Sequence, residues 1–400
     1  MTTLSSLPAP PPPPTDQVTQ PKRPLRVLQV VHRFFPELGG TEAHVAEVSR
    51  RLAGYPDLDV TVLTTDRSGE LQPQESVQGV PLIRRRAWPR ERDYYFSPGI
   101  YKEIASGDWD VVHMQGIHTL VPLAAMTAAR RSGTPYVVTF HSGGHSSATR
   151  TAARGAQVRA LTPVLRGAAQ LVAVSRFERD RFSAATGIAG DKFTVIGNGG
   201  SLPTVDSTIR PVPGRIVSSG RLEQYKGHHR AIEALPLIRL SRPDARLVIL
   251  GSGPYEQQLH ELAKRVGVSD AVEIRHLPPA DRGAMARDLA MAQVMAALSS
   301  YEAHPVGVME AVASGLPVVG FDVAGIGDLV EDGLVTGIPG SAGPTEVAAA
   351  LVAMMDSSDP AVPRVAPDVQ LPTWDGCAAA LAAVYRDVAE RAVSNAGAAL

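Results

Sequence analysis

The feature that most constrains the fold is an alternation of short apolar runs with amphipathic helical stretches, which begins at Leu25 and occurs twice along the 400 residues. This alternation is typical of a parallel sheet covered by helices on both faces. In the first half it predicts strands at residues 25–31, 60–65, 111–114, 136–140, 171–174 and 193–196. The first half is therefore predicted to form a Rossmann-like domain over residues 25–205.

The alternation stops in a proline-containing stretch between residues 201 and 215 and then begins again, which indicates a domain boundary. We expect a linker at residues 206–213 and a second Rossmann-like domain at 214–371. Residues 374–393 carry apolar side chains at helical spacing, so segment 372–400 is predicted to be a helix. The second set of predicted strands lies at residues 216–219, 247–250, 272–274, 294–298 and 318–321.

Bulk properties exclude several classes of protein. A net charge of -1 gives no overall field to attract nucleic acid, and no run of about 18 apolar residues is present to span a membrane. The single cysteine, Cys377, is predicted to be a buried apolar residue, which fits a reducing compartment. Residues 1–24 are proline-rich without an apolar signal core, so we expect a disordered tail and a cytoplasmic location.

Glycines and basic residues follow the first strand of each half. Gly39 and Gly40 precede a predicted helix, where backbone amides can bind an anion; a surface turn is the alternative. Arg221 and Lys226 occupy the corresponding place in the second half and could neutralise a diphosphate. Only five of the 39 basic residues are lysines, so a lysine at a helix start is notable. Two ordinary surface cations are the alternative interpretation.

The most specific motif lies at residues 302–311, after the strand predicted at 294–298. Open α/β sheets bind ligands at the carboxyl ends of their strands, so this is the expected edge for a site. Pro305 suits a first helical turn, and Gly307 allows a ligand to come close. Glu302 and Glu310 could then accept hydrogen bonds from sugar hydroxyls. A helix-start charge is the alternative for a single glutamate.

Together these motifs resemble family 4 of the nucleotide-sugar-dependent glycosyltransferases, which have the GT-B fold. The resemblance extends from Leu25 to about Val388, and it is most specific at residues 220–222, 226–227, 251–254 and 302–310. It implies an α/β architecture of two Rossmann-like parallel-sheet domains facing across a cleft. It also implies that the C-terminal helix crosses back to the first domain.

The resemblance implies a role for each matching residue. Arg221 and Lys226 would hold the diphosphate, Glu302 would contact the transferred sugar, and Glu310 would contact the ribose. In the first domain His141 would lie beside the donor sugar, so His141 and Glu302 are the predicted catalytic residues. The remaining predicted donor contacts are Gly39, Gly40, Leu277, His304, Pro305, Val306 and Gly307.

The chemistry implied by the family is transfer of a hexosyl-type sugar with retention, in which the leaving phosphate takes the proton of the acceptor. It requires no metal and no cofactor besides the nucleotide-diphosphate sugar, for which a UDP-sugar is favoured over a GDP-sugar. Three departures from the family pattern concern donor choice and hinge geometry. They are His304 at a usual aromatic position, Gly327 and Asp328 in place of a proline-glutamate pair, and residues 197–201 at the end of the first domain.

Two further segments could carry function. The triplets at residues 57–59 and 108–110 read Asp-x-Asp, but they precede strands and are interpreted as turns at the wrong edge for a catalytic metal. Basic residues surround Trp88, where they could meet anionic lipid or a phosphorylated acceptor; a solvated loop is the alternative. The predicted membrane-contacting residues are Arg84, Arg85, Arg86 and Arg90.

The alternatives to a transferase are a nucleotide-sugar epimerase, a glycosyl phosphorylase of the same fold, and a non-catalytic nucleotide-sugar binder. A phosphorylase needs a pyridoxal lysine or inorganic phosphate, and the five lysines include no dedicated candidate. A non-catalytic scaffold would not need a complete donor site. The acceptor stays open among small polyols, lipids, polysaccharides and secondary metabolites, because acceptor pockets are built from loops.

Overall fold

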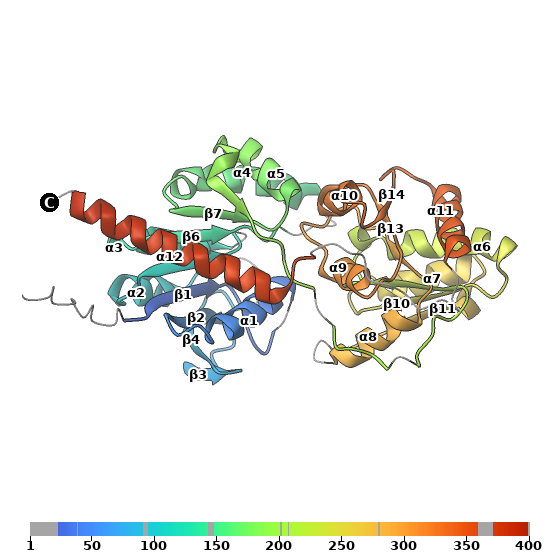
Figure 1. The fold of residues 1–400 in the computed structure, drawn as a ribbon, viewed down its shortest axis with the longest axis horizontal. Helices are drawn as coiled ribbons and strands as arrows, with labels where there is room; N and C mark the ends of the chain where they lie inside the picture. The colour runs from blue at the N-terminus through green and yellow to red at the C-terminus, as the bar shows by residue number, and fades with distance from the viewer. Residues whose placement is uncertain are drawn as a thin grey trace, which may run out of the picture.

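The computed structural model describes residues 23–398 except positions 38, 91–94, 118, 143–147, 201, 207, 279–280 and 359–370. The proline-rich start lies outside the described residues. The chain forms two α/β domains, each built on its own sheet, with the last helix lying across the first domain (Figure 1).

The first domain contains an eight-stranded sheet in the order β3-β4-β2-β1-β5-β6-β7-β8. All neighbouring strands are parallel except β3 and β4. The strands are β1 Leu25–Val31, β2 Leu58–Asp66, β3 Gln74–Val77, β4 Val80–Arg86, β5 Val111–Gln115, β6 Tyr136–Thr139, β7 Gln170–Ala173 and β8 Phe193–Val195. The helices are α1 Gly40–Leu52, α2 Pro98–Ser106, α3 Leu120–Ser132, α4 Ala148–Leu165 and α5 Arg176–Thr186, with a 3-10 turn, η1, at Gly190–Lys192.

The second domain contains a six-stranded parallel sheet in the order β11-β10-β9-β12-β13-β14. Its strands are β9 Arg215–Ser219, β10 Arg246–Leu250, β11 Val272–Arg275, β12 Val294–Ala297, β13 Val318–Phe321 and β14 Thr336–Ile338. Its helices are α6 His228–Ser241, α7 Glu256–Arg265, α8 Arg282–Met291, α9 Val306–Ala313, α10 Ala324–Glu331 and α11 Pro344–Ser357, with 3-10 turns η2 Gln224–Lys226 and η3 Ser269–Ala271.

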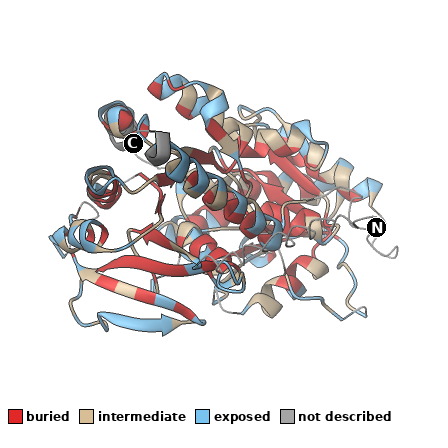
Figure 2. Cartoon of the chain, turned by 60° about the vertical axis from the view of Figure 1, so that its left-hand side comes forward, coloured by how far each residue is buried: buried red, intermediate tan, exposed pale blue. Residues whose placement is uncertain are grey.

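Burial explains why the central strands are readable from sequence. Strands β1, β5, β6, β12 and β13 are buried along most or all of their length, and helices cover both faces of each sheet (Figures 1 and 2). Burying apolar surface on both faces supplies the main driving force for folding, and it selects continuous apolar runs. The two sheets therefore fix the positions at which the carboxyl ends of their central strands lie.

The sheet of the first domain differs from the sequence prediction at its edge, where a hairpin of β3 and β4 was not predicted. Gln78 and Gly79 turn the chain with φ values of 52° and 82°, a left-handed pair that suits a two-residue hairpin. Strand β3 is almost fully exposed and polar, so it has no apolar run to reveal it. Strand β4 carries Arg84 to Arg86, which the sequence analysis treated as a surface segment.

The terminal helix α12, Trp374–Ala398, packs on the first domain (Figure 1), as the sequence analysis predicted. Its buried face contributes Trp374, Cys377 and Tyr385 to a cluster that includes Val27 and Val48. Cys377 is a free, buried cysteine, and burial raises its pKa to about 12. Ion pairs flank this contact: Arg386 to Asp57 at 2.7 Å, and Arg51 to Asp375 at 2.6 Å. No described helix is long and apolar enough to cross a bilayer.

Candidate active site

An ion pair between Lys226 and Glu302 lies at the carboxyl edge of the second sheet. Lys226 ends the turn η2 after β9, and Gly227 caps that turn in the left-handed conformation, φ 75°. A Cβ on Gly227 would lie 1.9 Å from the carbonyl oxygen of Leu298, so only glycine allows this loop to press against the end of β12. The close approach brings Lys226 Nζ to 2.5 Å from Glu302 Oε1.

The surroundings of this pair favour the charged form of Lys226. Each side chain is 17% exposed, and the hydroxyl of Ser299 donates to Glu302 Oε1 at 3.0 Å. Burial acts to lower the pKa of Lys226, but attraction to the Glu302 carboxylate outweighs it, and the pKa lies above its ordinary value. A fixed ammonium group at this edge is suited to a phosphate, and the carboxylate is suited to hydroxyl groups.

Glu310 lies inside helix α9 and is 4% exposed. It forms an ion pair with Arg282, the first residue of α8, which the sequence analysis did not identify. Burial raises the pKa of Glu310 to about 7, although Arg282 acts in the opposite direction. The carboxylate is therefore poised to change its ionisation near neutral pH. No sequence pattern pointed to Arg282, because it approaches Glu310 from a different helix.

The remaining predicted donor contacts of the second domain border this edge in different ways. Arg221 is exposed and pairs with Glu223 at 2.7 Å. Pro305 is the N-cap of α9, and a Cβ on Gly307 would lie 2.9 Å from Ser219 Oγ at the end of β9. His304, Val306 and Leu277 are partly exposed. Val306 packs against the apolar cluster of the first domain and α12, and Leu277 packs against a core cluster of the second domain.

In the first domain Gly39 and Gly40 begin helix α1 as expected, but the backbone amide of Gly39 already donates to a carboxylate. The Gly39 N–H donates to Glu42 Oε2 at 2.9 Å. Glu42 Oε1 accepts from Arg33 at 2.7 Å. A Cβ on Gly40 would meet no atom within 4 Å, so space remains beside the second glycine.

His141 follows β6 in a strained backbone conformation, with φ 47°. Its Nε2 lies 2.7 Å from Gln115 Oε1, and its ring centroid lies 4.5 Å from that of His44. Burial lowers the pKa of His44 to about 4, and burial lowers that of His304 to a similar value. These two imidazoles are therefore neutral at pH 7.

The two domains meet through residues that follow strands of both sheets. Ser142 Oγ lies 2.7 Å from Tyr301 Oη. Arg176, at the start of α5, pairs with Asp332 at 3.0 Å, and the Phe177 N–H donates to Asp328 Oδ2 at 3.2 Å. Asp328 is one of the positions where the sequence departs from the family pattern. It serves here as an interdomain hydrogen-bond acceptor.

The basic segment near Trp88 only partly matches the prediction of a membrane-contacting surface. Arg84 is buried at 4% exposure and donates to the carbonyl oxygens of Gln72 and Phe35, so it was wrongly predicted to face lipid. Its position in β4 directs it inward, because successive strand residues point to opposite faces. Arg85 is partly exposed and pairs with Glu103. Arg86 and Arg90 are exposed.

The two Asp-x-Asp triplets lie at the amino ends of their strands. Asp57 pairs with Arg386, and Asp110 accepts from the side chain of Arg23 and the backbone N–H of Arg26. Among the described residues no group of three or more histidine, cysteine and acidic side chains is arranged to share a metal ion.

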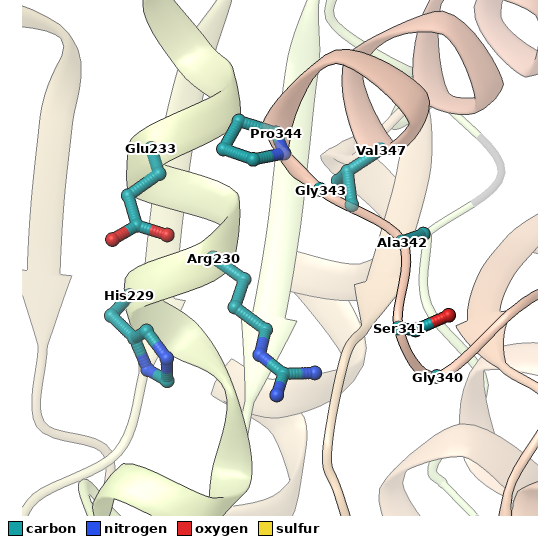
Figure 3. Close-up of a pocket in the computed structure, with 9 residues that line it drawn as sticks. All are labelled: His229, Arg230, Glu233, Gly340, Ser341, Ala342, Gly343, Pro344 and Val347. Atoms are coloured by element: carbon teal, nitrogen blue, oxygen red, sulfur yellow. The ribbon is translucent and has the colours of Figure 1, made fainter.

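A separate hollow of about 270 Å³ lies between the first turns of α6 and the loop before α11 (Figure 3). His229, Arg230 and Glu233 line one side of it, and Arg230 lies over the Phe321 ring at 4.5 Å. None of the predicted site residues lines this hollow.

Two family models match the chain, one in each half. The family model described as "Glycosyltransferase Family 4" matches residues 38–201, and the one described as "Glycosyl transferases group 1" matches residues 206–360. A GDP-mannose:cellobiosyl-diphosphopolyprenol alpha-mannosyltransferase of Xanthomonas oryzae is 30% identical over 303 residues, which are 72% of this chain and 77% of the relative. A glycogen synthase of Mycobacterium tuberculosis is 29% identical over 385 residues, 87% and 91% of the two chains.

Among solved structures, sucrose-phosphate synthase from Thermosynechococcus elongatus superposes with a TM-score of 0.72 at 19% identity, covering 91% of this chain and 99% of that chain. At this identity the likeness concerns the fold alone. Two parallel-sheet domains of this kind define the GT-B class of enzymes. With the sequence matches, they show that the chain belongs to family 4 of the glycosyltransferases, and it is a glycosyltransferase with a nucleotide-sugar donor.

Proposed function

We propose that the enzyme transfers a hexosyl-type sugar from its donor to an acceptor with retention of the anomeric configuration and without a metal ion. The observation that carries this proposal is the pairing of Lys226 with Glu302, with Glu310 in the following helix. One cation and two carboxylates at a sheet edge provide separate partners for phosphate, sugar and ribose. A non-catalytic scaffold has no comparable use for such a set, and donor hydrolysis or sugar transfer would exclude a non-catalytic binder.

Each residue then has a chemical role. Lys226 and Arg221 neutralise the departing diphosphate, Glu302 accepts hydroxyls of the sugar, and Glu310 accepts those of the ribose. His141 hydrogen-bonds the sugar as positive charge develops at the anomeric carbon. Gly40 leaves room for the phosphates, and the amides of the turn from His304 to Gly307 border them.

The transfer step requires no covalent enzyme intermediate. The acceptor oxygen forms its bond to the anomeric carbon on the face from which the phosphate oxygen leaves, and the leaving phosphate takes the acceptor proton. The protein contributes position and electrostatic stabilisation rather than a nucleophile. Among the possible bases we keep a UDP-sugar as the prediction to test. GDP-mannose, named in the mannosyltransferase relative, is the competing outcome.

The test begins with thermal unfolding of the purified protein against UDP, GDP, ADP and TDP and their common sugars, because selective binding raises the melting temperature. The best donor is then incubated with a panel of polyols, lipid-linked sugars, polysaccharides and secondary metabolites in the presence of a chelator. An axial-to-axial or equatorial-to-equatorial outcome by NMR supports retention. Inversion, a requirement for metal, or isomerisation without acceptor would refute the proposal.

The raised pKa of Glu310 predicts a pH dependence of donor binding. Ribose hydroxyls donate to the ionised carboxylate, so affinity rises as pH increases through about 7. We expect donor affinity to increase roughly tenfold from pH 6 to pH 8, as measured by calorimetry. Glu310→Gln should bind more weakly and with little pH dependence. An equally steep profile in that variant would assign the titration to another group.

We also propose that the exposed rim around Trp88 meets an anionic membrane surface. Trp88 and Phe96 are 43% and 49% exposed, and their backbones are hydrogen-bonded to each other at 3.0 and 2.9 Å. Arg86 and Arg90 are exposed beside them. Aromatic rings flanked by arginines suit the interface between lipid headgroups and acyl chains.

Sedimentation with lipid vesicles tests this surface. The double variant Arg86→Gln, Arg90→Gln should bind vesicles containing phosphatidylglycerol about 30-fold more weakly, because each surface arginine contributes ~1 kcal/mol. Arg246 and Arg265 are exposed arginines of the second domain, and their double substitution by glutamine is the matched control. Equal binding of all three proteins, or equal binding to neutral vesicles, would contradict this assignment.

A further inference from the structure

A network of polar side chains is buried beneath His141, between the first sheet and the terminal helix. Gln29 of β1, His113 and Gln115 of β5, and Tyr385 of α12 are all 0% exposed. Burying polar groups costs free energy unless each finds a partner, and an apolar set of the same volume would avoid that cost. A satisfied network at this position therefore calls for an explanation beyond core packing.

The hydrogen bonds of the network form one continuous chain that ends on His141. The amide of Gln115 donates to Gln29 Oε1 at 2.6 Å, and the amide of Gln29 donates to the Tyr385 hydroxyl at 2.7 Å. Tyr385 Oη lies 2.7 Å from His113 Nδ1. Gln115 Oε1 is then the acceptor that lies 2.7 Å from His141 Nε2.

The direction of these bonds defines the state of the imidazole. Because the amide nitrogen of Gln115 is committed to Gln29, its oxygen accepts, and His141 must carry a proton on Nε2. The tautomer of a neutral histidine is set by such a partner on one ring nitrogen. A ring held in one tautomer and one orientation presents its remaining atoms to the donor in a fixed geometry.

We infer that Gln115 is a positioning residue for His141, and that Tyr385 of the terminal helix anchors Gln115 through Gln29. The inference rests on the proposed role of His141 in transfer. His141 has φ 47°, a conformation that persists only where neighbouring contacts determine it. Through Tyr385, the helix that crosses from the second domain helps to hold a proposed catalytic side chain of the first.

A set of four variants separates positioning from packing. Gln115→Met keeps the length of the side chain but removes the acceptor, and Tyr385→Phe removes only the hydroxyl. We expect kcat to fall about 10- to 100-fold in Gln115→Met and less in Tyr385→Phe, with KM for the donor within twofold, because small misplacements of reacting groups have effects of this size. Gln115→Glu restores an acceptor and should recover part of kcat.

The matched control is Arg386→Gln, which removes the exposed ion pair with Asp57 beside Tyr385 on the same helix and should leave kcat unchanged. Nitrogen-15 NMR of the imidazole provides a readout independent of activity. His141 should be protonated on Nε2 in the unmodified protein and should lose that preference in Gln115→Met. A merely structural role of Gln115 would leave the tautomer unchanged in folded protein.

Combining His141→Ala with Gln115→Met distinguishes the two ways in which the inference can fail. If kcat is low in His141→Ala and no lower in the double variant, the two residues act together as inferred. If kcat is low in His141→Ala but Gln115→Met keeps full kcat and the same His141 tautomer, positioning by Gln115 is refuted and the role of His141 stands. If His141→Ala keeps full kcat, the proposed role of His141 is refuted, and the catalytic part of the inference with it.

Discussion

Replacing Lys226 by alanine should weaken binding of the nucleotide-sugar donor about 100-fold, or ~2.7 kcal/mol. The side chain is 17% exposed and is held by Glu302, so its charge is already desolvated and directed at the edge where the diphosphate is proposed to bind. Removing it deletes the phosphate contact and leaves a partly buried carboxylate facing the incoming anion. Truncating one member of such a pair typically costs 2–5 kcal/mol.

Isothermal calorimetry with the nucleoside diphosphate and with the sugar donor measures this loss directly. Lys264→Ala is the control, because Lys264 is an exposed lysine of the same domain. Melting temperatures of both variants show whether the protein remains folded. Undiminished donor affinity in Lys226→Ala would overturn the assignment of the phosphate site, whatever the effect on kcat.

His141→Ala should lower kcat by about 10²- to 10³-fold while leaving the donor dissociation constant within twofold. A hydrogen bond that strengthens as charge develops contributes to the transition state more than to the bound substrate, and removal of one preorganised hydrogen-bonding group has an effect of this size. The backbone strain at His141 and its hydrogen bond to Gln115 indicate that the ring is held in one place before the donor arrives.

Single-turnover kinetics at saturating donor separate this effect from binding. His260 is an exposed histidine on the second domain, and His260→Ala should retain the full rate. Loss of affinity with an unchanged kcat in His141→Ala would make this residue a binding contact rather than a catalytic one.

The sequence predicted buried strands better than exposed ones. Strand β1 was predicted with its observed bounds, and the other central strands within two residues at each end, because continuous apolar runs are visible without knowledge of their neighbours. The edge strands β3 and β14, and β4 next to β3, were not predicted. β3 and β14 are short and mostly exposed, and β4 carries three arginines. Their pairing is made by backbone hydrogen bonds, which form with any side chain and therefore leave no clear pattern in the sequence.

The candidate site was likewise predicted from the sequence only in part. By itself the sequence determined the two-domain α/β architecture and the positions of Lys226, Glu302 and Glu310 along it, since each lies in or beside a recognisable element. Only the tertiary structure decided the partners: Lys226 with Glu302, Arg282 with Glu310, and Gln115 with the network that includes Tyr385. The reason is distance along the chain. These contacts join residues 28 to 356 positions apart, and only folding determines which surfaces meet.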